Sequence, residues 1–176
     1  MSELMQPLRG RVWKFGDSVD TDQLLGAGAG QVVTDNLKAY CLRALRPEFA
    51  DEVQKGDVLV AGANFGCGSS RQTAVQALQE CGIAAVLAVS FARIYRRNSI
   101  ALALPSFAVP DITRFAADGE RLEIDYPARV VRNLTAGGEL KLTALPASVE
   151  EIYRLGGIFH VIANRLASQG VVPKRV

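Results

Sequence analysis

Three apolar stretches in the first half of the chain predict buried strands. Apolar and polar side chains alternate over residues 8–13, the pattern of a short strand. Residues 57–62 and 83–89 are almost continuous apolar runs, which is typical of strands covered on both faces. A helical pattern over 73–80 lies between those runs and closes at Cys81-Gly82, with the glycine just past the last turn. This order predicts two parallel strands joined by a crossover helix.

Two further helices are predicted from their cap residues. Thr34-Asp35 can cap a helix to about Leu45, and Arg46-Pro47 ends it because the residue before a proline disfavours helical geometry. Ser90 can cap another helix that runs to Ile100. Both helices are expected to flank the strands.

The second half of the chain changes to short strands separated by proline, glycine and Asp-Gly or Gly-Gly turns. These strands are predicted at residues 106–109, 121–124, 129–134 and 139–142. Residues 148–166 predict a helix with a start that resembles a capping box and a break at Gly156-Gly157. With 176 residues in total, the chain has room for one compact α/β domain, residues 1–176, of strands and flanking helices.

Charge and composition exclude several classes of function. Twenty Lys plus Arg against eighteen Asp plus Glu leave a net charge of +2, and the basic residues are scattered, so no nucleic-acid partner is expected. No apolar run approaches the length of a membrane span, and the first residues lack the apolar core of a signal peptide, so we expect a cytoplasmic protein without membrane contact. Three widely spaced cysteines and one histidine fit neither a disulfide framework nor a self-contained metal site. Any metal chemistry is expected to come from a partner.

The segment 64–71, Asn-Phe-Gly-Cys-Gly-Ser-Ser-Arg, is the sharpest candidate site. Its glycines allow a tight backbone, and the helix expected after it offers free N–H groups and a positive partial charge to an anion. Arg71 could hold a carboxylate, and Ser69 or Ser70 could act as a proton-transfer base with its alkoxide stabilised by N–H groups and the arginine. The alternative is a serine-capped helix with a salt bridge, and spacing alone leaves both open. The pattern matches neither a serine-hydrolase elbow nor a phosphate loop.

Other titratable side chains have weaker claims. Cys67 could be a nucleophile at a helix start, but no base can be assigned to it. Asp17, Asp20 and Asp22 lack the further ligands of a calcium loop and read as turn and cap residues, although we favour the option that one of them points into the serine site. His160, in an apolar stretch, is expected to be a core or partly exposed residue without a catalytic role.

Five blocks together resemble one family, the small subunit of 3-isopropylmalate dehydratase, which is equivalent to the swivelling domain of aconitase and homoaconitase. The blocks occur in the family's order between about residue 8 and residue 166, at 16–23, 47–50, 56–62, 64–71 and 90–94. The resemblance implies a swivelling β/β/α domain, a small barrel-like mixed sheet core flanked by helices.

The resemblance also implies a function. In this family a large subunit carries a [4Fe–4S] cluster, so this chain is expected to bind no cofactor itself and to form a hetero-oligomer with a cluster-bearing large subunit. The substrate is a small 2-hydroxy carboxylate, with 3-isopropylmalate of leucine biosynthesis as the first choice, isomerised by dehydration and rehydration. By motif position Ser69 is the base, Ser70 its supporting neighbour and Arg71 the substrate-carboxylate clamp, while Thr21 and Asp22 match an active-site pair.

The chain departs from the family pattern mildly at residues 99–105 and more consequentially at two places in the candidate site. Gln72-Thr73 follow Arg71 where the family has a glutamate. The expected substrate-recognition segment lacks the usual Arg-Tyr-Leu type sequence and consists of Gly26, Ala27, Gly28, Ala29, Gly30 and Gln31. Without an arginine for a third carboxylate, this segment argues against citrate or homocitrate. Another alkylmalate substrate, a non-catalytic carboxylate-binding module of the same fold, and self-association of the isolated chain remain open alternatives.

Overall fold

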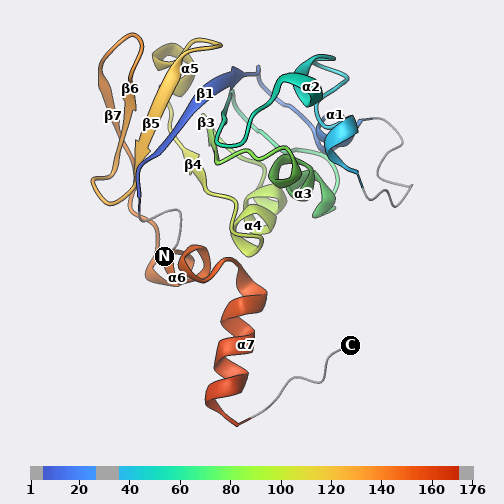
Figure 1. The fold of residues 1–176 in the computed structure, drawn as a ribbon, viewed down its shortest axis with the longest axis vertical. Coiled ribbons are helices and arrows are strands. Elements are labelled where there is room, and N and C mark those ends of the chain that lie inside the picture. Colours follow the sequence, from blue (N-terminus) through green and yellow to red (C-terminus); the bar gives the residue numbers. More distant parts are fainter. Residues whose placement is uncertain (1–5, 27–35, 171–176) are drawn as a thin grey trace.

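The computed structural model describes residues 6–26 and 36–170, and its centre is a seven-stranded mixed sheet that curls strongly across its width (Figure 1). The strand order is β4-β3-β2-β1-β5-β6-β7. The strands are β1 Leu8–Lys14, β2 Val58–Ala61, β3 Ala85–Ala88, β4 Ser106–Ala108, β5 Arg121–Asp125, β6 Val130–Asn133 and β7 Glu139–Lys141. The α/β class and the curled, barrel-like mixed sheet expected from the resemblance are confirmed.

Strand β1 joins a parallel half of the sheet to an antiparallel half. It runs parallel to β2, with Val12 opposite Val58, and antiparallel to β5, with Gly10 opposite Leu122. The sequence requires a glycine at position 10, because a Cβ atom there would lie 2.0 Å from the carbonyl oxygen of Gly56. The parallel strands β1 to β4 follow the crossover pattern predicted from the apolar runs, and β5 to β7 form an antiparallel meander.

Helices cover both faces of the parallel half (Figure 1). The helices are α1 Thr21–Leu25, the 3₁₀ turn η2 Lys38–Tyr40, α2 Phe49–Glu52, α3 Thr73–Glu80, α4 Arg93–Ala101, α5 Ile112–Phe115, α6 Ala147–Leu155 and α7 Ile158–Ser168. Helix α3 is the crossover between β2 and β3, as predicted.

The core is divided between the two faces of the sheet. Strand β2 shows the division, because all four of its residues are buried and alternate between two apolar clusters. Leu59 and Ala61 pack with side chains from α1 to α4. Val58 and Val60 pack with α5, α6 and the antiparallel strands.

Helices α6 and α7 are separated by the Gly156-Gly157 break, as predicted, and both glycines have positive φ. Helix α7 projects away from the sheet and its covering helices (Figure 1). It buries Val161 but leaves Phe159 68% exposed and Ile162 46% exposed. No helix in the described residues is long and apolar enough to span a bilayer.

The predicted helix to Leu45 is wrong over the residues that the structure describes. Its first residues, 34–35, lie outside the described ranges, and beyond them only η2 and a turn are formed. The reason is a tertiary contact: Leu42 is fully buried, has φ +55°, and donates its N–H to the carbonyl of Leu24 in α1. That conformation does not occur inside a helix.

Two predicted side-chain caps are also wrong. Helix α4 begins after Ala92 without a side-chain cap, and Ser90 instead accepts a hydrogen bond from the Asn64 N–H, 2.9 Å away. Helix α6 begins after Pro146, again without a side-chain cap. Both helices are therefore held by packing of their buried side chains more than by their ends.

Candidate active site

Residues 64–71, called the serine loop from here on, connect the carboxyl end of β2 to α3. Short bridges join this loop to two other segments, Asp20 to Cys67 and Phe65 to Phe91. Gly66 and Gly68 both adopt positive φ. A Cβ atom at Gly66 would lie 2.2 Å from the ring of Tyr95, so this glycine is needed both for its backbone angle and for the close packing below it.

An aromatic cluster supports the serine loop from beneath. The ring of Tyr95 lies edge-on to Phe65 at 5.1 Å and is stacked with Phe91 at 5.9 Å. Tyr95 is only 2% exposed. Sequence reasoning missed this cluster, although aromatic residues at 65, 91 and 95, next to the motif and at the start of the following helix, were a usable signal.

Neither Ser69 nor Ser70 caps α3, so the alternative of a serine-capped helix start is wrong. The helix begins at Thr73 after Gln72, without a side-chain cap. The hydroxyl of Ser69 instead receives two hydrogen bonds from Arg71, one from Nε at 3.0 Å and one from the backbone N–H at 3.4 Å. A cationic donor and a second N–H thus converge on one oxygen, the arrangement that stabilises an alkoxide.

Asp22 completes this group from α1. Its Oδ1 accepts a hydrogen bond from Arg71 Nη2 at 2.5 Å, so Arg71 bridges Asp22 and Ser69. The Asp22 side chain is 69% exposed and that of Arg71 33% exposed, which leaves the site open on one side. The Nη1 donors of the guanidinium have no hydrogen-bond partner among the described residues.

Thr21 holds the serine loop through its backbone. The Thr21 hydroxyl accepts the N–H of Ser69 at 2.9 Å, and the Thr21 N–H donates to the Cys67 carbonyl, also at 2.9 Å. Thr21 is 2% exposed, so its hydroxyl is committed to the loop. The Ser69 N–H is therefore engaged by Thr21, and the backbone N–H that reaches the Ser69 hydroxyl is that of Arg71.

The three aspartates near α1 have three different positions. Asp17 accepts a hydrogen bond from the Ala63 N–H and braces a turn. Asp20 caps α1 by accepting from the N–H of Gln23, whose side chain accepts the Asp20 N–H in return. Asp22 alone reaches Arg71. Sequence analysis missed α1 itself, although Asp20 and Gln23 three positions later form a capping box that could have predicted it.

Ser70 contributes its carbonyl to the site. That oxygen accepts a hydrogen bond from Asn98 Nδ2 of α4 at 3.0 Å. Ser70 itself is an exposed residue. Asn98 was not foreseen, since nothing in the sequence near position 98 indicates a contact with residue 70.

Only part of the expected recognition segment can be placed. Gly26 directly follows α1 with φ +76°, and a Cβ atom there would lie 3.2 Å from the carbonyl of Tyr40. The remaining predicted substrate-binding residues lie outside the described residues: Ala27, Gly28, Ala29, Gly30 and Gln31. Gly26 is four residues beyond Asp22, so the expected segment begins about one helical turn along the chain from that aspartate.

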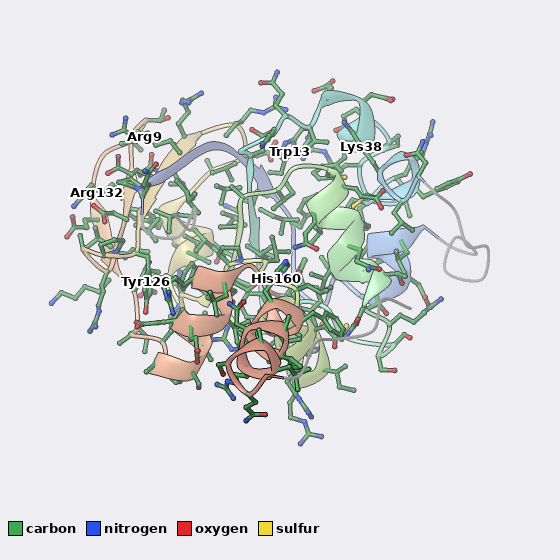
Figure 2. All side chains as sticks on the ribbon, turned by 60° about the horizontal axis from the view of Figure 1, so that its bottom comes forward. Arg9, Trp13, Lys38, Tyr126, Arg132 and His160 are labelled. Carbon is green, nitrogen blue, oxygen red and sulfur yellow. The ribbon has the colours of Figure 1, made fainter. Side chains whose placement is uncertain are left out.

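The cysteines and the histidine stand apart from this group. The half-buried Cys67 thiol donates to the Ser18 carbonyl at 3.5 Å. Cys41 and Cys81 are buried together, and their mutual hydrogen bond, followed by burial, raises the pKa of Cys41 well above its ordinary range. His160 is exposed on α7 (Figure 2). Within residues 6–26 and 36–170 no three acidic, cysteine or histidine side chains gather into a metal-binding group.

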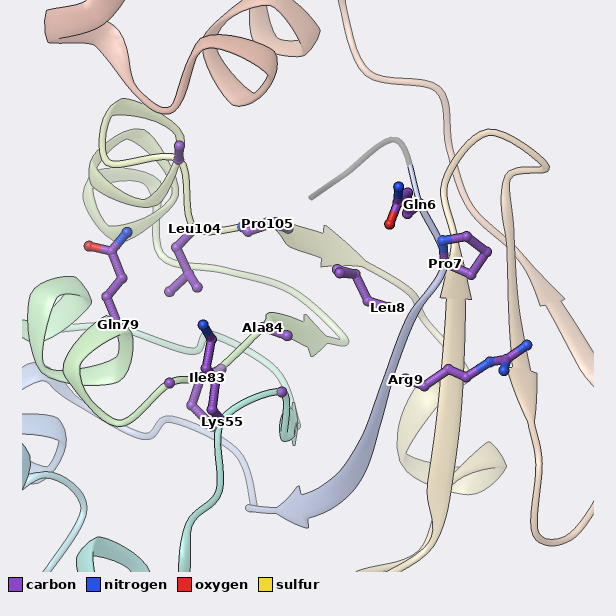
Figure 3. Close-up of a pocket in the computed structure, with 13 residues that line it drawn as sticks. Gln6, Pro7, Leu8, Arg9, Lys55, Gln79, Ile83, Ala84, Leu104 and Pro105 are labelled. Carbon is purple, nitrogen blue, oxygen red and sulfur yellow. The ribbon is translucent and has the colours of Figure 1, made fainter. Parts of the chain in front are cut away.

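A separate cavity of about 390 Å³ opens between the start of β1 and the end of α3 (Figure 3). Gln6, Lys55, Gln79 and Pro105 are among its lining residues. None of the predicted site residues lines it. The candidate site is therefore the serine loop with α1, and not this hollow.

Comparison of the sequence with those of known proteins finds a family of relatives. Residues 34–109 match the aconitase C-terminal domain. The chain is 44% identical over 153 residues to the methanogen homoaconitase small subunit of Methanothermobacter thermautotrophicus, covering 86% of this chain and 88% of the relative. It is 39% identical over 168 residues to the 3-isopropylmalate dehydratase small subunit of Aquifex aeolicus, covering 94% and 100%.

A solved structure agrees with the sequence comparison. The crystal structure of 3-isopropylmalate dehydratase from Methanocaldococcus jannaschii superposes with a TM-score of 0.88 at 36% identity, covering 94% of this chain and 98% of that one. Identity of this level over nearly the whole length of both chains, together with the shared fold, shows common descent. The chain belongs to the family of small subunits of 3-isopropylmalate dehydratase and homoaconitase.

Proposed function

We propose that the chain is the small subunit of a hydro-lyase that isomerises a 2-hydroxy dicarboxylate by dehydration and rehydration, with 3-isopropylmalate of leucine biosynthesis as the substrate. The observation that carries this proposal is the convergence of two Arg71 donors on the Ser69 hydroxyl. A lone serine is a poor base. A serine whose oxygen receives a guanidinium N–H and a backbone N–H can hold the negative charge that a base requires.

The residues of this chain have distinct roles in the proposed reaction. Ser69 takes the proton from the carbon next to a substrate carboxylate and returns a proton in the opposite sense of the reaction. Arg71 stabilises the Ser69 oxygen through Nε and offers its Nη1 donors to the carboxylate. Asp22 fixes the guanidinium in this orientation by its ion pair with Nη2. Thr21 fixes the loop, and Ser70 supplies the carbonyl that α4 holds.

We propose that a large subunit completes the site. The Asp22–Arg71 pair is open to solvent in this chain, whereas proton abstraction from carbon needs a site that excludes water. A [4Fe–4S] cluster held by that subunit would supply the Lewis acid that binds the substrate hydroxyl and a carboxylate. This chain is then a single swivelling domain, residues 1–176, that covers the cluster-bearing partner.

The substrate follows from what the recognition segment lacks. The relatives carry the names of both homoaconitase and 3-isopropylmalate dehydratase small subunits, so the family alone leaves the substrate's side group open. Residues 24–37 contain no Arg or Lys to pair with a third carboxylate. We therefore propose that the segment from Gly26 to Gln31 contacts an uncharged substituent, which favours 3-isopropylmalate or another alkylmalate over homocitrate.

The test is turnover by the assembled enzyme. The chain is co-expressed anaerobically with a candidate large subunit and assayed with 3-isopropylmalate, methylmalate, dimethylmalate, homocitrate and citrate. Turnover of an alkylmalate by the complex, and by neither chain alone, is the expected result. A stable complex that turns over none of these compounds would contradict the proposal and favour a non-catalytic carboxylate-binding module. Preference for homocitrate would contradict the assigned substrate.

Ser69→Ala in the same complex is expected to lower kcat by about 10²–10⁴-fold, because the base is lost. Arg71→Lys is expected to lower it by about 10²–10³-fold, because a lysine cannot bridge Ser69 and Asp22. Both variants should still assemble with the large subunit, as seen by gel filtration. Ser168→Ala and Arg165→Lys on α7 are the matched controls, since both side chains make only local contacts on α6 and α7. Near-normal turnover in either site variant would overturn its assigned role.

A further inference from the structure

The peptide group between Ser70 and Arg71 is held from both of its polar ends. On one end, the Ser70 carbonyl accepts a hydrogen bond from Asn98 Nδ2 at 3.0 Å. On the other end, the Arg71 N–H donates to the Ser69 hydroxyl at 3.4 Å. Asn98 lies 28 positions further along the chain, on α4, so this contact links two elements that are separate in sequence.

Holding the carbonyl determines where the N–H points. A trans peptide group is planar, and its C=O and N–H project to opposite sides. When Asn98 fixes the Ser70 oxygen, the plane of that group cannot rotate without breaking the hydrogen bond. The Arg71 N–H is thereby kept directed at Ser69 Oγ. Serine-loop residues 69–71 lie outside any helix or strand, so no ladder of backbone bonds would otherwise fix this plane.

Helix α4 is a rigid support for this contact. Tyr95, one turn before Asn98 on the same face, is buried beneath Gly66 of the serine loop. Ser99, next to Asn98, is fully buried and its hydroxyl donates to the Arg96 carbonyl. Helix α4 therefore contacts the serine loop at two points. The Tyr95 ring packs against Gly66, and the Asn98 amide donates to the Ser70 carbonyl.

A second element independently holds an earlier peptide group of the loop, the one between Gly68 and Ser69. The N–H of Ser69 donates to the Thr21 hydroxyl on α1. Thr21 thus determines where the Ser69 backbone lies, and Asn98 determines where the Arg71 N–H points. The two contacts do not share a donor or an acceptor, so removing one should leave the other in place.

We propose that Asn98 is a positioning residue for the Ser69 base, acting through the Ser70–Arg71 peptide group to keep the Arg71 N–H on the serine oxygen. The inference rests on the proposed role of Ser69. Among the described residues, the Asn98 amide donates to the Ser70 carbonyl and not to the Ser69 side chain or the Arg71 guanidinium. Its contribution to catalysis is the orientation of one of the two donors that stabilise negative charge on Ser69.

The principal variant is Asn98→Ala, which removes the amide and leaves a good helix former on α4. Asn98→Asp is the second variant, because it keeps the shape but replaces the donor by oxygens that cannot donate. Gln79→Ala is the matched control: Gln79 Nε2 donates to the Leu102 carbonyl at 2.7 Å, a bond of the same type on neighbouring α3, outside the serine loop.

The first measurement is amide hydrogen exchange by NMR on the full-length isolated chain, which requires no activity. In Asn98→Ala the Arg71 N–H is expected to exchange about tenfold faster than in the unmodified chain. The Ser69 N–H, held by Thr21, is expected to keep its rate. In Gln79→Ala both rates are expected to stay unchanged. An unaltered Arg71 rate in Asn98→Ala overturns the proposal, whatever the enzyme does.

The second measurement is the pH profile of kcat and KM in the complex with the large subunit. Asn98→Ala is expected to lower kcat roughly tenfold with KM within about twofold of the unmodified enzyme. The acid limb of kcat should move to higher pH, because the alkoxide has lost a donor. Asn98→Asp should show the same decrease in kcat and the same shift of the acid limb. If kcat falls in Asn98→Asp but not in Asn98→Ala, the cause is the added charge, and the proposal is overturned. The proposal is also overturned if kcat of Asn98→Ala stays within about twofold of the unmodified value.

The two measurements separate this inference from the function on which it rests. If the unmodified complex turns over no substrate, the proposed function fails, and the exchange rates still decide whether Asn98 orients the Arg71 N–H. If the unmodified complex is active and Ser69→Ala is inactive, the function stands and the Asn98 variants are judged on kcat and its pH profile.

Discussion

Tyr95 places a phenol in the apolar core directly beneath the serine loop. Its hydroxyl has no hydrogen-bond partner among the described residues, and burial raises its pKa well above its ordinary value of 10.0. Tyr126 is the opposite case, since its hydroxyl donates to Glu150 Oε1 and accepts the Leu145 N–H. A buried polar atom without a partner costs free energy, whereas a satisfied one contributes a little. The aromatic ring of Tyr95, and not its hydroxyl, therefore supports the site.

Tyr95→Phe is expected to leave the free energy of unfolding unchanged or to raise it by up to about 1 kcal/mol at neutral pH. Tyr126→Phe, the control, should lower it by about 1–2 kcal/mol, because the Leu145 N–H loses its acceptor. Urea denaturation followed by circular dichroism measures both. Above pH 10 an unfolded tyrosine ionises while folded Tyr95 stays neutral, so stability is lost as pH rises and Tyr95→Phe should lose less of it. A clearly destabilised Tyr95→Phe at neutral pH would mean that the hydroxyl has a partner.

Individual residues of the site were predictable to different degrees. Ser69 and Arg71 are two positions apart, so their sequence spacing alone suggested that they act together. Asp22 lies 49 positions from Arg71, and only the resemblance brought Thr21 and Asp22 into the site. The predicted cap at Ser90 failed because its hydroxyl is used by the Asn64 N–H, a contact between distant segments. A local sequence pattern does not reveal contacts between distant segments. For the same reason the contact of Asn98 with the Ser70 carbonyl could not be predicted.

At the scale of elements, Glu123 joins three strands of the antiparallel half. It stands directly opposite Arg9 of β1 and Arg132 of β6, and it forms an ion pair with each of them. Glu123 is 6% exposed. Hydrogen bonds from Arg132 first and Arg9 second hold the pKa of its carboxyl below the ordinary value of 4.5. Opposite charges facing one another across strands also fix the register of those strands.

Glu123→Gln is expected to lower the free energy of unfolding by about 1–2 kcal/mol at neutral pH. Because the folded pKa of Glu123 is lower than the unfolded one, its contribution is complete above about pH 4.5 and is lost as pH falls through the folded pKa. The difference between Glu123→Gln and the unmodified chain should therefore shrink below pH 4.5 in urea denaturation at stepped pH. Glu139→Gln, an exposed partner of Arg132, is the control and should change stability by less than about 0.5 kcal/mol. A pH-independent difference would show that the ion pairs do not carry the effect.

The elements themselves were predicted unevenly, and the reason is physical. Strands β2 and β3 were evident because full burial selects continuous apolar residues. The helix expected near residues 35–45 has the right side chains, but Leu42 is needed to pack and bond against α1, and that contact overrides helix propensity. Helix α1 is five residues long, too short for apolar periodicity to reveal it.

At the scale of the whole molecule, the sheet with its covering helices and the projecting α7 contribute differently to stability. Both apolar clusters are built around the sheet, and α6 adds the buried Tyr153 to one of them. Helix α7 adds Val161 and an exposed ion pair between Arg165 and Glu151. Stability therefore depends on the sheet and α6 far more than on α7.

A chain ending at Gly157, without α7, is expected to stay folded and to lose about 1–2 kcal/mol, the value of one buried valine. A chain ending at Pro146 also loses Tyr153 and should be destabilised by at least about 3 kcal/mol. Urea denaturation of both truncated chains beside the full-length chain measures the difference. Equal losses in the two truncated chains would contradict this division.

The central place of β1 in the sheet has a consequence for synthesis of the chain. This strand leaves the ribosome before the other strands of the sheet, and β2 can pair with one of its edges early. Its other edge pairs with residues 121–124 and must wait until they emerge. At roughly 5–20 residues per second, that row of backbone N–H and C=O groups stays open to neighbouring nascent chains for several seconds. Pairing of β5 with β1 closes this edge and ends the exposure. Slow translation between β2 and β5 should therefore increase aggregation of the nascent chain.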